Sequence, residues 1–177
     1  MQADKISVVD SKLISWGQTF LALEAAKLAR AGLAVSEILA RVHELRSHIE
    51  VIFTVSTLDY LRKGGRIGRV SAAIGSLLNI KPLIRVDDGV YTSFGKVRTL
   101  SQAIEQFVAF AQKRVGNGGL QLAIGHGGAQ EAAQRLVEAA LCTLRPAGDV
   151  QHFEVGPAIG VHTGPGTLGM AFYPVQG

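Results

Sequence analysis

The chain has 177 residues, of which 47% are hydrophobic and 18% charged, and its formal net charge is +4. These values are ordinary for a globular protein, so we expect a sizeable core in one ample domain or two small ones. No apolar run approaches the roughly 18–20 residues that a membrane span needs, and no signal-peptide pattern opens the sequence, so an integral membrane protein is not expected.

The single cysteine, Cys142, excludes an internal disulfide and fits a reducing, cytoplasmic environment. Because it falls within an apolar helical pattern, we expect a buried structural thiol. The mild positive charge permits acidic partners without requiring them.

The N-terminal third opens with an apolar run at 5–10, which predicts a short buried strand. Two helices are expected next. In the second helix, Ser36 stands where a capping side chain would begin it, and apolar residues recur every three or four positions. The β-branched and aromatic residues at 51–55 predict a further strand.

Residues 56–65 are typical of a short helix that ends in a left-handed cap at Gly64 or Gly65. Another short helix is expected at 72–78. The stretches 80–86 and 90–97 flank an Asp-Asp-Gly turn, so they predict a β-hairpin.

The second half alternates helices and strands. Thr99 and Gln102 have the spacing of a capping box, and they precede an amphipathic helix. A strand at 119–126 and an alanine-rich helix that stops before Pro146 follow. Three short strands are expected to close the chain, at 150–156, 158–162 and 169–175. The order predicts a mixed α/β protein, and a shift in composition near residue 50 predicts a domain boundary there.

Several kinds of site are disfavoured by spacing. Gly164, Gly166 and Gly169 satisfy G-x-G-x-x-G, but only eight residues follow, too few for the helix of a dinucleotide site. His43 and His48 lie five apart on a helix, and no pair of Cys or His has zinc spacing. The sequence contains no G-x-S-x-G elbow. We therefore expect no metal, no cofactor and no nucleophilic catalysis.

Two tight turns carry arginines. Arg66 follows two glycines, and Arg98 immediately precedes the predicted capped helix. An arginine held on a turn is suited to grip an anion or an acidic partner, although either guanidinium could simply bond a carbonyl. Arg62 and Lys63 are typical of a solvated surface at a helix C-terminus. Without interleaved aromatic residues or a recognition helix, this basic stretch does not predict nucleic-acid binding.

The loop Gly-Val-His-Thr-Gly-Pro-Gly at 160–166 places His162 among small and turn-forming residues. Glycines in such a turn let backbone and ligand approach closely, and histidine changes its protonation readily near neutral pH. Spacing alone leaves two interpretations open: a polar contact at the mouth of a site, or a partly buried histidine bonded to a backbone carbonyl.

Read together, the stretches 8–17, 53–89, 95–99 and 156–173 closely resemble the DegV family. The resemblance implies that this is an α/β protein whose residues 51–177 form a DegV-like C-terminal domain of mixed sheet with flanking helices. Residues 1–50 would be a remnant of the first α/β domain.

The family resemblance implies a non-enzymatic protein that binds one long-chain fatty acid in an apolar tunnel. His162 matches the family's histidine at the carboxylate, with Thr163 and Gly164 beside it and Arg66 near the head group. Arg98 and Arg62 would lie on the face that docks a fatty-acid kinase. A carboxylate in an apolar tunnel must be hydrogen-bonded, and each buried methylene contributes about 0.8 kcal/mol, so the physics agrees with this assignment.

The chain departs from the family at its start. Family members carry a preceding domain with a serine and a threonine that also hold the carboxylate, so this chain is expected to be a fragment, a chain with a mis-assigned start or a shortened member. Its exposed N-terminal elements would need cover from a homodimer mate or a swapped element. The alternative hypothesis is a fragment of a phosphotransferase-like enzyme acting on a small polar substrate.

Overall fold

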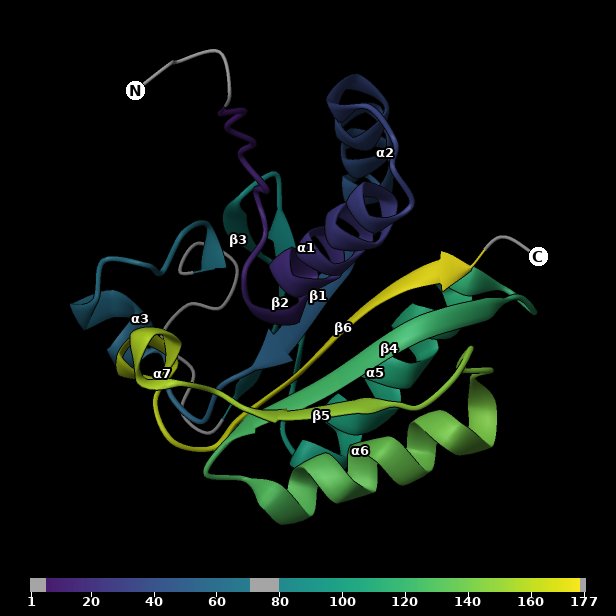
Figure 1. The fold of residues 1–177 in the computed structure, drawn as a ribbon. Helices are drawn as coiled ribbons and strands as arrows, with labels where there is room; N and C mark the ends of the chain where they lie inside the picture. Colours follow the sequence, from purple (N-terminus) through teal and green to yellow (C-terminus); the bar gives the residue numbers. More distant parts are fainter. Residues whose placement is uncertain (1–5, 71–79, 176–177) are drawn as a thin grey trace.

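The computed structural model describes residues 6–70 and 80–175, and a mixed sheet runs through the described part of the chain (Figure 1). Its strand order is β3-β2-β1-β6-β4-β5, and every neighbouring pair is antiparallel except β4 and β5. The α/β architecture with a mixed sheet is as predicted. The strands are β1 (Glu50–Thr54), β2 (Lys81–Asp87), β3 (Val90–Val97), β4 (Gly119–Gly127), β5 (Gln151–Glu154) and β6 (Thr167–Val175).

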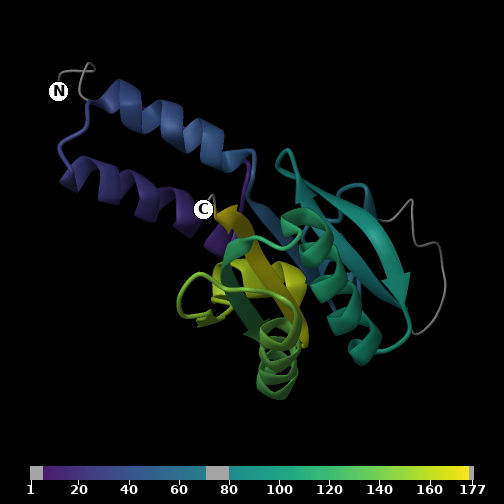
Figure 2. The same cartoon turned by 90° about the vertical axis from the view of Figure 1, so that its right-hand side faces the viewer.

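Helices cover both faces of this sheet. Helices α5 (Leu100–Val115) and α6 (Gln130–Thr143) lie on one face, and α1 (Ser15–Arg30) starts on the other (Figure 1). Helix α2 (Val35–Arg46) runs antiparallel to α1, and the pair extends away from the sheet (Figure 2). The short helices α3 (Asp59–Lys63) and α7 (Pro157–Thr163) lie together at one end of the sheet. None of the helices in the described ranges has the length and hydropathy to cross a membrane.

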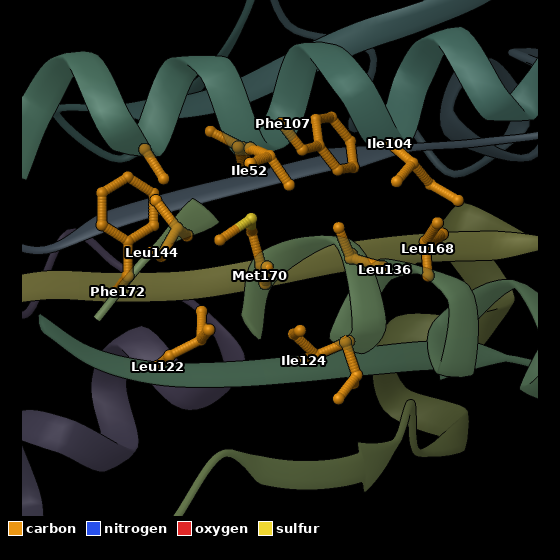
Figure 3. Close-up of a cluster of buried hydrophobic side chains, with 14 of the residues drawn as sticks. Ile52, Ile104, Phe107, Leu122, Ile124, Leu136, Leu144, Leu168, Met170 and Phe172 are labelled. Carbon is orange, nitrogen blue, oxygen red and sulfur yellow. The ribbon is translucent and has the colours of Figure 1, made fainter. Parts of the chain in front are cut away.

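The main core lies between the sheet and the α5–α6 layer (Figure 3). Phe107, Leu136 and Phe172 are fully buried in it. Helix α5 begins with the predicted capping box: the Thr99 hydroxyl accepts from the Gln102 N–H at 3.2 Å, and the Gln102 side chain accepts from the Thr99 N–H. The cap fixes where α5 starts, and therefore which of its side chains face the sheet.

The β2–β3 hairpin is also as predicted. Asp88 and Gly89 at its turn have φ of 50° and 80°, the left-handed conformations that a two-residue hairpin turn demands. The helix predicted at 56–65 is present as α3, and Gly65 after it has φ 67°. The helix predicted at 72–78 lies outside the described residues.

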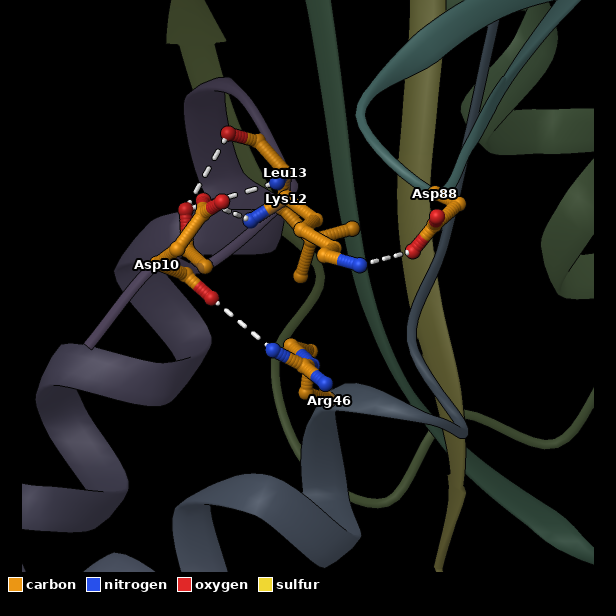
Figure 4. A network of polar contacts seen from close by, with 6 residues as sticks. Asp10, Lys12, Leu13, Arg46 and Asp88 are labelled. Atoms are coloured by element: carbon orange, nitrogen blue, oxygen red, sulfur yellow. Dashed lines mark hydrogen bonds and ion pairs between the residues drawn. The ribbon is translucent and has the colours of Figure 1, made fainter.

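The strand predicted at 5–10 was wrong for the described residues 6–10, which form neither helix nor strand and pair with no strand in the described part of the chain. A polar network ties this segment down instead (Figure 4). The Lys12 ammonium pairs with Asp88 at 2.5 Å, and the Arg46 guanidinium donates to the Asp10 carbonyl at 2.9 Å.

Three local predictions were wrong for different reasons. Helix α2 begins one residue before Ser36, and the Glu37 carboxylate accepts from the Ala34 N–H at 2.9 Å in place of a serine cap. The strand predicted at 158–162 is helix α7, because Pro157 at its first turn favours helical φ. Cys142 is exposed rather than buried, since it lies on the outer side of α6.

Candidate ligand-binding site

An apolar slot lies on the α1 side of the sheet, opposite the α5–α6 layer. It holds about 420 Å³ of empty space, part of it open to solvent. Its walls come from segments far apart in sequence. They include Ile14, Val51, Phe53, Phe153, Ile159 and Ala171.

Two threonines line the slot where α7 meets β6. Thr163 is 2% exposed, and its hydroxyl donates to the Ile159 carbonyl at 3.3 Å. Thr167 is also buried, and its hydroxyl donates to the Gly164 carbonyl at 2.7 Å. Each hydroxyl oxygen keeps acceptor capacity after donating its hydrogen. We call the end of the slot marked by these two internally bonded hydroxyls its polar end.

His162 lies in α7 directly before Thr163, and its ring rests on Gly64 after α3. A Cβ on Gly64 would overlap the Nδ1 atom of His162, so the ring can lie there only because residue 64 is glycine. This Nδ1 is buried and has no hydrogen-bond partner in the described part of the chain. A buried polar atom without a partner costs about 1–3 kcal/mol, so a ligand that formed a hydrogen bond with this nitrogen would remove that cost.

The turn after His162 depends on two glycines. Gly164 and Gly166 have φ of 74° and 82°, which favour glycine. Gly164 abuts the Tyr60 ring, where any Cβ would overlap it. The Gly166 N–H donates to the Gly127 carbonyl at 2.7 Å. The turn thus fixes α7 against both α3 and the end of β4.

Arg66 reaches the same place from the other side. Its guanidinium donates to the Gly64 carbonyl at 2.9 Å, so Arg66 and His162 both contact Gly64. Burial raises the pKa of the Tyr91 hydroxyl, and the positive charge of Arg66 opposes that rise. The structure therefore brings a cation and the buried Nδ1 of His162 to the same residue, Gly64.

The remaining candidates lie outside the slot. Arg62 is exposed and pairs with Asp59 at 3.1 Å. Arg98 is exposed and follows β3, at the end of the sheet where α3 and α7 lie, as the strand registers show. Among the predicted residues only Thr163 lines the slot itself. Gly164 accepts from Thr167 at the polar end, whereas the His162 ring and Arg66 meet at Gly64, which lies outside the slot lining.

The sequence interpretation missed the apolar walls, Phe53, Phe153 and Ile159 among them. A usable signal was present in the strands at 122–125 and 168–172, where large and small residues alternate. Period-two alternation of size assigns the small residues to one face, which then has room for a ligand. Within the described ranges, no group of His, Cys, Asp and Glu could hold a metal ion.

The candidate site is thus an apolar slot on one face of an α/β sheet. A family model described as "Uncharacterised protein, DegV family" matches residues 1–175. A DegV domain-containing protein of Streptomyces coelicolor is 38% identical over 165 residues, which cover 93% of this chain and 59% of the relative. The chain belongs to the DegV family, and it spans about three fifths of the length of the relatives it matches.

Solved structures agree with this assignment. A DegV family protein from Thermus thermophilus, described by its fatty acid binding, superposes with a TM-score of 0.90 at 31% identity, over 96% of this chain and 61% of that one. A fatty acid binding DegV family protein from Streptococcus agalactiae gives a TM-score of 0.87 at 29% identity, over 97% and 60% of the two chains. The fold is thus that of proteins described as binding fatty acids.

Proposed function

We propose that this chain binds a long-chain fatty acid, with the acyl chain in the apolar slot and the carboxylate at its polar end. The observation that carries the proposal is the buried Nδ1 of His162, which has no hydrogen-bond partner among the residues that the structure describes. A fatty acid supplies both things that the site lacks, an acceptor or donor for this nitrogen and apolar groups for the slot.

The charges around the slot suit an acid head group. A carboxylate accepts hydrogen bonds strongly from charged donors, and Arg66 adds a positive charge next to Gly64. The Thr163 hydroxyl and the Gly164 N–H belong to the same turn, and they would exchange their present acceptors, the Ile159 and Gly160 carbonyls, for the carboxylate. Apolar walls favour the acyl chain by about 0.8 kcal/mol for each methylene that they cover.

We also propose that the chain binds and carries its ligand without catalysing a reaction on it. The protein would act in the cytoplasm. The structural relatives described for fatty acid binding support this proposal. The apolar lining of the slot is a poor fit for the small polar substrate of a phosphotransferase-like enzyme, so that alternative is not favoured.

A partner enzyme would take up the bound acid. Arg62 and Arg98 are exposed at the end of the sheet where the head group would lie, so a fatty-acid kinase docking there would meet basic side chains close to the carboxylate. Salt would weaken such docking, because exposed charges are screened.

We also propose that a domain boundary lies at residue 50. Residues 1–50 would be the remnant of a first domain, and residues 51–177 would form the C-terminal domain. Ile6 and Val8 are 63% and 92% exposed, and a contact that buried these apolar side chains would be favourable. A second copy of the chain in a homodimer, or further residues of a longer protein, would supply it.

Native mass spectrometry of the protein purified from bacteria tests the main proposal. We expect a co-purified acid of about 16–18 carbons, since each methylene adds to affinity. His162→Ala should retain less acid, whereas His152→Ala, at an exposed histidine of β5, should retain the wild-type amount. Arg98→Ala should spare retention and weaken coupling to a kinase. Protein that stays free of lipid, even with added acid, would refute fatty acid binding by this chain.

A further inference from the structure

One level of the sheet has an unusual composition on the slot side. Across β1, β6, β4 and β5, the register pairs Phe53 with Gly169, Gly169 with Gly125, and Gly125 with Phe153. Two adjacent glycines therefore form a floor, with a phenylalanine on either side. All four residues line the slot.

Phe153 occupies its position because residue 125 has no side chain. A Cβ on Gly125 would overlap three atoms of the Phe153 ring, so the ring lies directly over the glycine. On its other side the ring meets Trp16 of α1, with centroids 6.1 Å apart. Trp16 in turn packs edge-on against Phe20 at 5.5 Å. Phe153 is thus held between the floor of the sheet and the first turn of α1.

A second hollow lies on the same face, beyond Trp16. It holds about 710 Å³ of empty space, part of it open to solvent, and Trp16, Phe20, Gln151 and Tyr173 line it. Along β5, residue 151 lines this second hollow and residue 153 lines the slot. The contact between Phe153 and Trp16 therefore stands where the slot and the second hollow meet.

We infer that Phe153, braced by Trp16, is the partition that limits the length of the bound acyl chain. This inference rests on the proposed fatty acid binding. With the ring in place, a chain entering from the polar end stops within the slot. Without it, the chain could continue into the second hollow, where each additional covered methylene would multiply the affinity about fourfold.

The test compares dissociation constants for straight saturated acids from about 12 to about 22 carbons, the range over which per-methylene burial can be followed. Phe153→Ala should move the preferred length upward, with affinity rising about fourfold per carbon beyond the wild-type optimum. Phe153→Trp should move the preferred length downward. Phe110→Ala removes a half-buried ring from the opposite face and should leave the profile unchanged.

Trp16 provides a second readout, because it is the only tryptophan of the chain. Its emission should respond to acid binding in the wild type, and should shift on Phe153→Ala even without lipid, since it loses its ring contact. If the wild type binds acids and Phe153→Ala keeps the same length profile, the partition is refuted and fatty acid binding stands. If the wild type binds no acid of any length, the proposed function fails and the partition fails with it.

Discussion

The two faces of strands β4 and β6 carry side chains of very different size. Toward α5 and α6 these two strands present large residues, and toward α1 they present small ones at the alternate positions. The large set is Leu122, Ile124, Leu168, Met170 and Phe172, and the small set is Ala123, Gly125, Gly169 and Ala171.

This difference separates two tasks. Large interlocking side chains on one face bury most of the apolar surface and stabilise the fold. Small residues on the other face leave the space that becomes the slot. Substitutions on the first face should therefore change stability, whereas substitutions on the second should change ligand binding as well.

The largest loss of stability is expected on the packed face. Phe107 of α5 is fully buried between the helix layer and the sheet. Phe107→Ala should lower the free energy of unfolding by about 3–5 kcal/mol, because it removes a ring and leaves a cavity. Urea denaturation would measure this loss. Leu141→Ala, at a side chain that is 55% exposed, is the control; an equal loss there would contradict the account.

A smaller loss is expected on the slot face. A Cβ on Gly169 would lie 2.8 Å from the Phe53 Cβ and 2.9 Å from the Ile52 carbonyl oxygen. Gly169→Ala should therefore cost about 1–3 kcal/mol and also weaken acid binding. In helix α7, a Cβ on Gly160 would meet nothing closer than 4.0 Å, so Gly160→Ala should be neutral or slightly stabilising. If Gly160→Ala lowered stability and acid binding as much as Gly169→Ala, steric crowding at Gly169 would not explain the loss.

A smaller, pH-dependent effect is expected at Glu50. Burial raises the pKa of this carboxyl more than the Arg114 guanidinium, 2.9 Å away, and Arg85 lower it. The folded protein then holds the proton more tightly than the unfolded chain, so stability falls as pH rises through the raised pKa.

Glu50→Gln removes the ionisable carboxyl, and with it the loss of stability at higher pH. The glutamine amide oxygen can still accept a hydrogen bond from Arg114. Its free energy of unfolding should exceed that of the wild type near neutral pH and equal it once the solution is more acidic than the ordinary carboxyl pKa. Denaturation curves at several pH values would show this trend. A larger advantage for the variant in acid than at neutral pH would reverse the assigned sign.

The smallest effect on global stability is expected where Lys12 pairs with Asp88, because both side chains are exposed. The Lys12 ammonium holds the pKa of Asp88 below its usual value, so this contribution is present above that value and lost as pH falls. Lys12→Ala should leave the unfolding midpoint nearly unchanged but speed hydrogen exchange in residues 6–14. Lys96→Ala, on an exposed part of β3, should leave that exchange unaltered.

Local signals predicted much of the fold. The Thr99–Gln102 spacing located the start of α5, and Asp88-Gly89 located the β2–β3 hairpin, because both depend on neighbouring residues. Helix α7 was missed because a short apolar run fits helix or strand equally well. The conformation of residues 6–10 depended on whether a neighbouring strand was available, which the segment itself does not encode.

The candidate site also has a part that local sequence predicts and a part that it does not. The turn at 160–166 drew attention to His162 because its glycines and proline are contiguous. The slot was not predictable to this degree, since its floor joins residues 53, 125, 153 and 169 through a strand order that only the sheet reveals. The alternation of large and small residues indicates a face with room, but the register decides what lies beside what.

The most direct test of the central claim is a magnetic-resonance titration with palmitate that carries an isotopic label at its carboxyl carbon. The account predicts one bound carboxyl resonance that saturates at one acid per chain. It should move in His162→Ala and keep its place in His152→Ala. The absence of a bound resonance, or a bound resonance indifferent to His162→Ala, would contradict the account.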